Sequence, residues 1–142
     1  MKTTSMQIKR VRCILLVPGR GFVLIKRIKS DDPAYYVFPG GGVESFDASP
    51  EDALQRELQE ELGAAITDIR IAGDSITGNG DAERFFYAEC SSLEAKFVGE
   101  EKELPGRGSY DVVFVTNSAD LIGKNILPSA AGRWLREVIS RF

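Results

Sequence analysis

The chain has 142 residues, with 18 basic and 21 acidic side chains, a net charge of −3 at pH 7 and no histidine. This length predicts a single domain over residues 1–142 that can bury a core of its own. The charge balance argues against a protein that binds duplex nucleic acid through its phosphates. Without histidine, Ser-His-Asp and zinc-histidine chemistries are excluded. A general base must therefore be a carboxylate, a metal-bound hydroxide, or a Lys, Tyr or Cys side chain.

Cysteine content and the N-terminal segment bear on the compartment. Cys13 and Cys90 are too few and too far apart in the sequence for a disulfide framework or a zinc site, which favours free thiols in a reducing compartment. The N-terminal segment reaches an apolar run of about five residues before Pro18, too short to span a membrane, and it lacks a signal-cleavage pattern. We therefore expect a cytoplasmic protein with no membrane partner.

The first half of the chain predicts a hairpin, a strand and a helix. Two β-rich runs in residues 11–28 flank the turn residues 18–21, which is typical of a β-hairpin. "YYVFPGGG", residues 35–42, predicts a short strand ended by three glycines that let the backbone turn tightly and approach a ligand. A helix of about 13 residues should follow, because Ser49 suits the N-cap, Pro50 the first helical position and Gly63 the left-handed position after the helix.

The second half predicts mainly strands and a closing helix. "ITDIRIAGDSIT", "ERFFYAEC" and "YDVVFVT" are β-rich, "GEEKELPGRGS" is expected to be a charged loop, and "SADLIG" a helical turn. "PSAAGRWLREVISRF" predicts an amphipathic helix, with Trp134, Leu135, Val138 and Ile139 at helical spacing. The order of elements predicts an α+β domain, an α/β/α sandwich with a mixed β-sheet.

The segment "RELQEELG", residues 56–63, crowds three carboxylates on one helix. Glu57, Glu60 and Glu61 stand at i, i+3 and i+4, where each like-charged i,i+4 pair costs roughly 0.2 to 0.5 kcal/mol. Solvent and an Arg56–Glu60 pair are one way to offset this repulsion, and a divalent cation is the other. The predicted buried stripe, Leu54, Leu58 and Leu62, lies about 100° around the helix from the carboxylates, which therefore border the core.

Residues 39–63 resemble the Nudix box, a motif that would occupy residues 42–64 here. Its second half matches from Arg56 to Gly63, with Ala64 in place of a larger aliphatic residue. Its first half is out of register, because the position of the motif's first Glu falls on Ala48, and Asp47 lies one residue earlier. Either Asp47 replaces that Glu through a longer loop or the carboxylate is absent. The similarity extends to "FVLIKR", "RFFYAEC" and "GRGSYDVVFV", and so covers most of the chain.

The resemblance implies Mg²⁺- or Mn²⁺-dependent hydrolysis of a pyrophosphate bond in a nucleoside diphosphate linked to another group. It implies Glu57 and Glu61 as metal ligands, Glu60 as a third ligand or the base, and a carbonyl near Gly41 as a further ligand. Arg56 would orient Glu57. The catalytic residues implied by the resemblance are Arg56, Glu60 and Glu61. In some members the base comes from a late loop, where this chain offers Glu100, Glu101 and Glu103.

Substrate-binding candidates come from the hairpin and the third strand. Arg12, Lys26 and Arg27 are the nearest cations for phosphates, and either Tyr35 or Tyr36, which alternate across a strand, could stack on a base or ribose. We expect Arg12, Arg27 and Tyr36 to bind a small nucleotide. The nucleotide itself stays open among nucleoside triphosphates, ADP-ribose, nucleotide sugars and dinucleoside polyphosphates. An alternative is a Nudix-like sensor that binds a nucleotide without cleaving it, and a homodimer also stays open.

Overall fold

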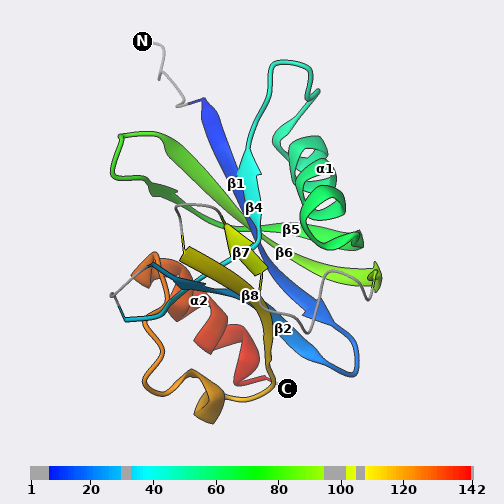
Figure 1. Cartoon of the computed structure of the whole chain (residues 1–142). Helices are drawn as coiled ribbons and strands as arrows, with labels where there is room; N and C mark the ends of the chain where they lie inside the picture. Colours follow the sequence, from blue (N-terminus) through cyan, green and yellow to red (C-terminus); the bar gives the residue numbers. More distant parts are fainter. Residues whose placement is uncertain (1–6, 30–32, 95–101, 105–107, 142) are drawn as a thin grey trace.

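The computed structural model describes residues 7–29, 33–94, 102–104 and 108–141. An eight-stranded sheet forms its centre, with a helix on each face (Figure 1). The main strand order is β5-β6-β1-β2-β8-β7, with β4 added to β1 and β3 added to β2. The strands are β1 Ile8–Val17, β2 Gly21–Ile28, β3 Tyr35–Val37, β4 Gly40–Gly42, β5 Ala65–Ile76, β6 Ala82–Ser92, β7 Lys102–Leu104 and β8 Gly108–Val115. β1 and β6 are parallel and the other pairs antiparallel, so the predicted mixed sheet is confirmed.

Helix α1, Pro50–Leu62, begins and ends where local signals predict. The Ser49 hydroxyl accepts a hydrogen bond from the Asp52 N–H at 3.1 Å. Gly63 takes the left-handed conformation with φ of 59°, and its N–H donates to the Gln59 carbonyl. Leu54, Leu58 and Leu62 are fully buried, as the stripe predicts.

Two hydrophobic cores separate the sheet from its helices. The α1 core gathers alternate residues of β1 with the helix leucines and Phe86, and the α2 core gathers the other face of β1 with Phe38, Phe85 and helix α2, Ser129–Ile139. Cys13 and Cys90 are free and buried in the α1 core. The α/β/α sandwich is therefore confirmed. No described helix is long and apolar enough to cross a membrane.

The central strands β1 and β2 separate beyond their hairpin. They pair with each other only at Leu16–Phe22 and Val17–Gly21. Further along, β1 pairs with β4 and β2 pairs with β3, so the segment that joins β3 to β4 bridges the two strands. The Cys13 N–H donates to the Pro39 carbonyl at 2.9 Å inside this bridge. The bridge brings the glycines of β4 alongside the second half of α1.

The structure differs from the sequence predictions in two elements. The glycines at 40–42, predicted as a turn, form strand β4 against β1. Position 40 requires glycine, because its φ is 149° and an added Cβ would lie 2.1 Å from the Val11 carbonyl oxygen. The charged loop after β6 contains the short strand β7, which pairs with β8, while residues 99–101 and 105–107 lie outside the described residues. "SADLIG" forms the predicted turn as a 3-10 helix, η2 Ser118–Leu121.

Candidate active site

Two of the three helix carboxylates lie against the glycines of β4. The Glu61 Oε1 atom accepts a hydrogen bond from the Gly40 N–H at 3.1 Å. The Glu57 carboxylate lies so close to Gly41 that an added Cβ there would come within 2.4 Å of its Cδ and Oε2 atoms. Gly41 therefore permits Glu57 to approach the backbone, and the two carboxylates lie beside strand β4.

Burial dominates the electrostatics of Glu61. Loss of solvent raises the pKa of the Glu61 carboxyl to about 7 from an ordinary value of 4.5. The hydrogen bond from Gly40 and the charges of Arg12 and Arg27 oppose this rise, while the Glu57 charge adds to it. A carboxyl in this position needs a proton or a cation to offset its burial.

Arg56 connects the loop before α1 to the carboxylates. Its Nε and Nη2 atoms donate to Asp47 Oδ1 and Oδ2 at 3.0 and 2.8 Å, a two-point contact with a side chain that is 4 % exposed. Nη2 also donates to the Gly42 carbonyl at 3.0 Å, and Nη1 to Glu57 Oε1 at 3.1 Å. Arg56 thus contacts Glu57 directly, and the orienting role that the resemblance implies stays a prediction.

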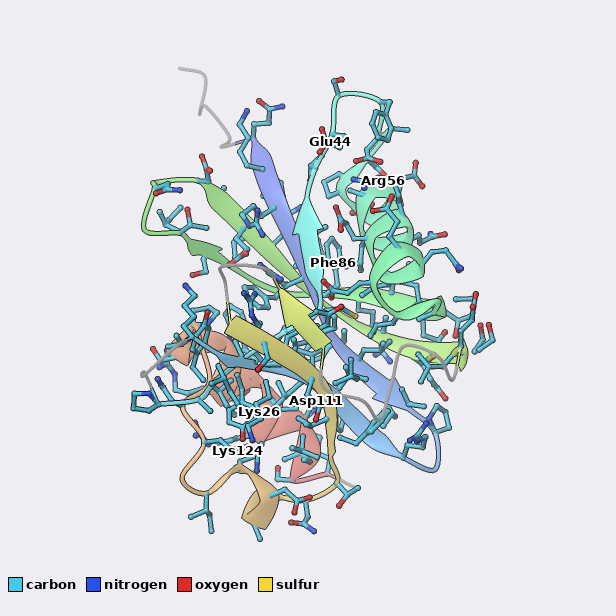
Figure 2. The ribbon with its side chains drawn as sticks, in the orientation of Figure 1. Lys26, Glu44, Arg56, Phe86, Asp111 and Lys124 are labelled. Carbon is cyan, nitrogen blue, oxygen red and sulfur yellow. The ribbon has the colours of Figure 1, made fainter. Side chains whose placement is uncertain are left out.

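Asp47, the acidic residue next to the out-of-register motif position, is held from two sides, and its replacement of the motif's Glu stays a prediction. Besides the contact with Arg56, its Oδ2 accepts the Glu44 N–H at 2.8 Å, which fixes the loop. In Figure 2, Glu44 lies beyond the end of β4 and Arg56 on α1. The hydrogen bond from Arg56 holds the pKa of Asp47 below its ordinary value, with a smaller contribution from the Glu44 N–H. The Phe46 ring lies beneath the Arg56 guanidinium at 5.2 Å, a cation-π contact.

Glu60 lies apart from the other two carboxylates. Its side chain is 60 % exposed and pairs with Arg56 Nη1 at 3.4 Å. This is the solvent-and-arginine arrangement considered from the sequence. Of the proposed loop bases, Glu101 lies outside the described residues, and Glu103 is on β7 opposite Ser109. The roles of Glu60, Glu101 and Glu103 stay predictions.

The substrate-binding candidates fall in three different surroundings. Arg27 lies on the α1 side, close enough to Glu61 to affect its charge, and its buried Nε finds no hydrogen-bond acceptor in the described part of the chain. Arg12 lines a cavity of about 320 Å³ on the α2 side. Tyr36 is packed against the α2 core, with the Lys124 ammonium 5.5 Å from its ring, and is absent from that cavity's lining. Its stacking role stays a prediction.

The cavity beside Arg12 is linked to the carboxylates through Gly40, which pairs with Arg12 and donates its N–H to Glu61. Its walls include Phe38, Phe85, Leu127 and Pro128, and Arg12 is the register partner of Gly40. A second cavity of about 350 Å³ lies near the hairpin end, between α2, β5 and β6, and contains none of the motif residues. Sequence reasoning missed Glu83, Leu127 and Pro128 at the first cavity. The charge of Glu83 within the apolar strand "ERFFYAEC" was the only available signal for it.

The donor set fits a hard divalent cation. Among residues 7–29, 33–94, 102–104 and 108–141, no three Asp, Glu, Cys or His side chains are grouped closely enough to hold a metal by themselves. Mg²⁺ usually takes one or two carboxylates and completes its shell with backbone, water and phosphate oxygens. Glu57, Glu61 and the nearby backbone of Gly41 fit that requirement, and no described arginine or lysine forms a salt bridge with Glu61.

This sandwich, with glutamates held against a glycine-rich strand, defines the Nudix class of folds. The NUDIX domain model matches residues 6–125, so the chain belongs to that family. Among solved structures, MutT from a study of Aliivibrio salmonicida and Vibrio cholerae has a TM-score of 0.62, with 24 % identity over 95 % of this chain and 98 % of the other. A NUDIX hydrolase from Nitrosomonas europaea has a TM-score of 0.64, with 14 % identity over 95 % and 90 % of the two chains. These two likenesses show the fold.

Sequence relatives match over shorter stretches. The U8 snoRNA-decapping enzyme of Mus musculus is 40 % identical over 62 residues, which cover 40 % of this chain and 32 % of the relative. The 8-oxo-dGTP diphosphatase of Proteus vulgaris is 44 % identical over 46 residues, covering 32 % and 40 % of the two chains. The chain thus matches less than half the length of either relative.

Proposed function

We propose that the chain hydrolyses a pyrophosphate bond in a nucleoside diphosphate linked to another group, with Mg²⁺ or Mn²⁺ held by Glu57 and Glu61. The observation that carries this proposal is the placement of both carboxylates against Gly40 and Gly41, beside a cavity large enough for a nucleoside. Membership of the NUDIX family and similarity to a U8 snoRNA-decapping enzyme and an 8-oxo-dGTP diphosphatase support the same chemistry.

Each residue has a role that follows from its surroundings. A divalent cation supplies positive charge for the phosphate oxygens. Arg56 keeps Glu57 in place through the contact at 3.1 Å, and Asp47 keeps Arg56 in place. Arg27, next to Glu61 and with an unsatisfied buried N–H, binds a phosphate oxygen. Ionised Glu61 accepts a proton from the attacking water or binds the cation, and Glu60 or a carboxylate of the late loop is the other candidate base.

The alternative function is a sensor that binds a nucleotide without cleaving it. Its support in the sequence was the altered first half of the Nudix box. The two-point contact of Asp47 with Arg56 favours hydrolysis over the sensor, because it places a carboxylate beside the arginine that contacts Glu57.

The test is a substrate screen of the purified protein with Mg²⁺. The panel holds ordinary and oxidised nucleoside triphosphates, ADP-ribose, a nucleotide sugar and a dinucleoside polyphosphate, and released phosphate is read with and without a phosphatase. Glu61→Gln is the matched control for contaminating activity. Hydrolysis of one class, lost in the variant, supports the proposal. Nucleotide binding with no turnover above that of the variant would establish the sensor instead.

A further inference from the structure

Taken as a whole residue, Glu83 of β6 is the least exposed charged residue in the described part of the chain, at 7 %. A buried carboxylate is costly unless it is paired and hydrogen-bonded. Two arginines of the neighbouring strand β1 meet this need. The Nε atoms of Arg10 and Arg12 lie 3.4 and 3.2 Å from the same Glu83 oxygen, Oε2.

This ion cluster fixes the orientation of Arg12. Its Nε is held by Glu83, and its Nη1 donates to the Phe38 carbonyl at 2.9 Å, so the guanidinium plane is anchored at two points. A guanidinium has five N–H donors. These contacts use two of them and leave donors on the adjacent Nη1 and Nη2 atoms, for which no described residue provides an acceptor.

Arg12 and Glu83 both line the cavity beside the active site. The other walls are mainly apolar, with Phe38, Phe85 and Leu127 among them. A flat heteroaromatic group suits such walls, and polar groups in a mostly apolar pocket select the ligand. Since Glu83 and the Phe38 carbonyl fix its guanidinium plane, Arg12 presents a rigid pair of donors that suits the flat edge of a base, and Arg27 is left for a phosphate.

We propose that Arg12, positioned by Glu83, recognises the carbonyl edge of a 6-oxopurine base, guanine or hypoxanthine, in this cavity. The proposal rests on the proposed function for the placement of the phosphates at Glu57 and Glu61. Paired donors of an arginine match the O6 and N7 acceptors of guanine, whereas adenine presents an amino donor at its six position. Arginine has no acceptor for that donor, so a 6-aminopurine loses one contact and leaves a donor facing a donor.

The test measures binding of mononucleotides, which contain no pyrophosphate bond and so separate base recognition from hydrolysis. Dissociation constants for GMP, IMP, AMP and CMP are determined by titration calorimetry with Mg²⁺ present. We expect GMP and IMP to bind more tightly than AMP by about 5- to 150-fold, the discrimination of one two-point arginine contact. CMP should bind no better than AMP.

Three variants assign the preference to the cluster. Arg12→Lys keeps a charge for Glu83 but lacks the planar pair of donors. The preference for GMP and IMP over AMP should therefore vanish, while the affinity for AMP changes little. Glu83→Gln should reduce the preference because it weakens the anchor of Arg12. Arg70→Lys, at the other cavity, should leave it unchanged. Melting temperatures identify variants that fail to fold.

Equal affinity of the parent for IMP and AMP, or a uniform loss for all four nucleotides in Arg12→Lys, would overturn the assignment. So would an absence of measurable binding. The proposed function fails on a different result, namely no hydrolysis by the parent in the substrate screen, and the two outcomes can therefore be told apart.

Discussion

Replacement of Glu61 by Gln should stabilise the metal-free protein at alkaline pH. The folded protein raises the pKa of Glu61 from 4.5 to about 7 through burial. Because a raised carboxyl pKa favours the protonated form, its stabilising contribution is complete below about pH 4.5 and is lost as the pH rises through about 7. At about 1.4 kcal/mol for each pH unit, ionising Glu61 in the folded state costs about 3 kcal/mol at pH 8.

Glutamine removes that cost, since it carries no charge and its amide oxygen can still accept the Gly40 N–H. We expect the free energy of unfolding of Glu61→Gln to equal that of the parent near pH 4.5 and to exceed it by about 3 kcal/mol near pH 8 in chelator. This is larger than the few tenths of a kcal/mol expected from crowding on an exposed helix alone. The difference arises because Glu61 is buried against β4.

Urea unfolding at several pH values, in chelator, measures this difference. Glu60→Gln is the matched control, because its side chain is 60 % exposed and its loss should change stability by only a few tenths of a kcal/mol. Added Mg²⁺ should nearly cancel this difference at a hundredfold excess over its dissociation constant, where it stabilises the parent by about 2.7 kcal/mol, and reverse the order at a thousandfold excess, where it adds about 4.1 kcal/mol. Parallel stability profiles of parent and Glu61→Gln from acid to alkaline pH would refute the reasoning.

Three further outcomes follow from the same geometry. Activity on any substrate should be abolished by excess chelator, restored by Mg²⁺ or Mn²⁺, and rise toward alkaline pH as the carboxylates ionise; full turnover in chelator would exclude the metal site. Gly41→Ala should lower kcat with little change in melting temperature, because the added Cβ meets the movable end of the Glu57 side chain at 2.4 Å. In Gly40→Ala the added Cβ meets the Val11 backbone at 2.1 Å, so this variant should unfold. Asp47→Ala should retain the fold by circular dichroism and lose roughly 10- to 100-fold in activity, as for other residues that hold a metal ligand in place; parent-like turnover would show that the loop carboxylate is dispensable.

Local signals allowed α1 to be predicted, whereas contacts between residues distant in the sequence could not be predicted. The ends of α1 depend on Ser49, Pro50 and Gly63, each of which acts within one helical turn. Strand β4 depends on a partner about 30 residues away in β1, and three glycines carry no strand propensity, so a turn was the natural expectation.

The burial of Glu83 was equally hidden from sequence reasoning. Its burial follows from the parallel pairing of β1 with β6, which places Arg10 and Arg12 beside it. Parallel partners are joined by long connections, so neither the pairing nor its register can be read from neighbouring residues. A charge in an apolar strand indicated an unusual position, but the partner that makes the charge tolerable appears only in the fold.

Asp47 shows why a motif count can fail where the geometry succeeds. Relative to the Nudix pattern, the loop has one residue more before Arg56, and the acidic side chain has one methylene less. Arg56 still donates hydrogen bonds to both Asp47 carboxylate oxygens, at 3.0 and 2.8 Å. Since the requirement is a carboxylate within reach of that guanidinium, spacing along the chain and side-chain length can vary together while the contact is preserved.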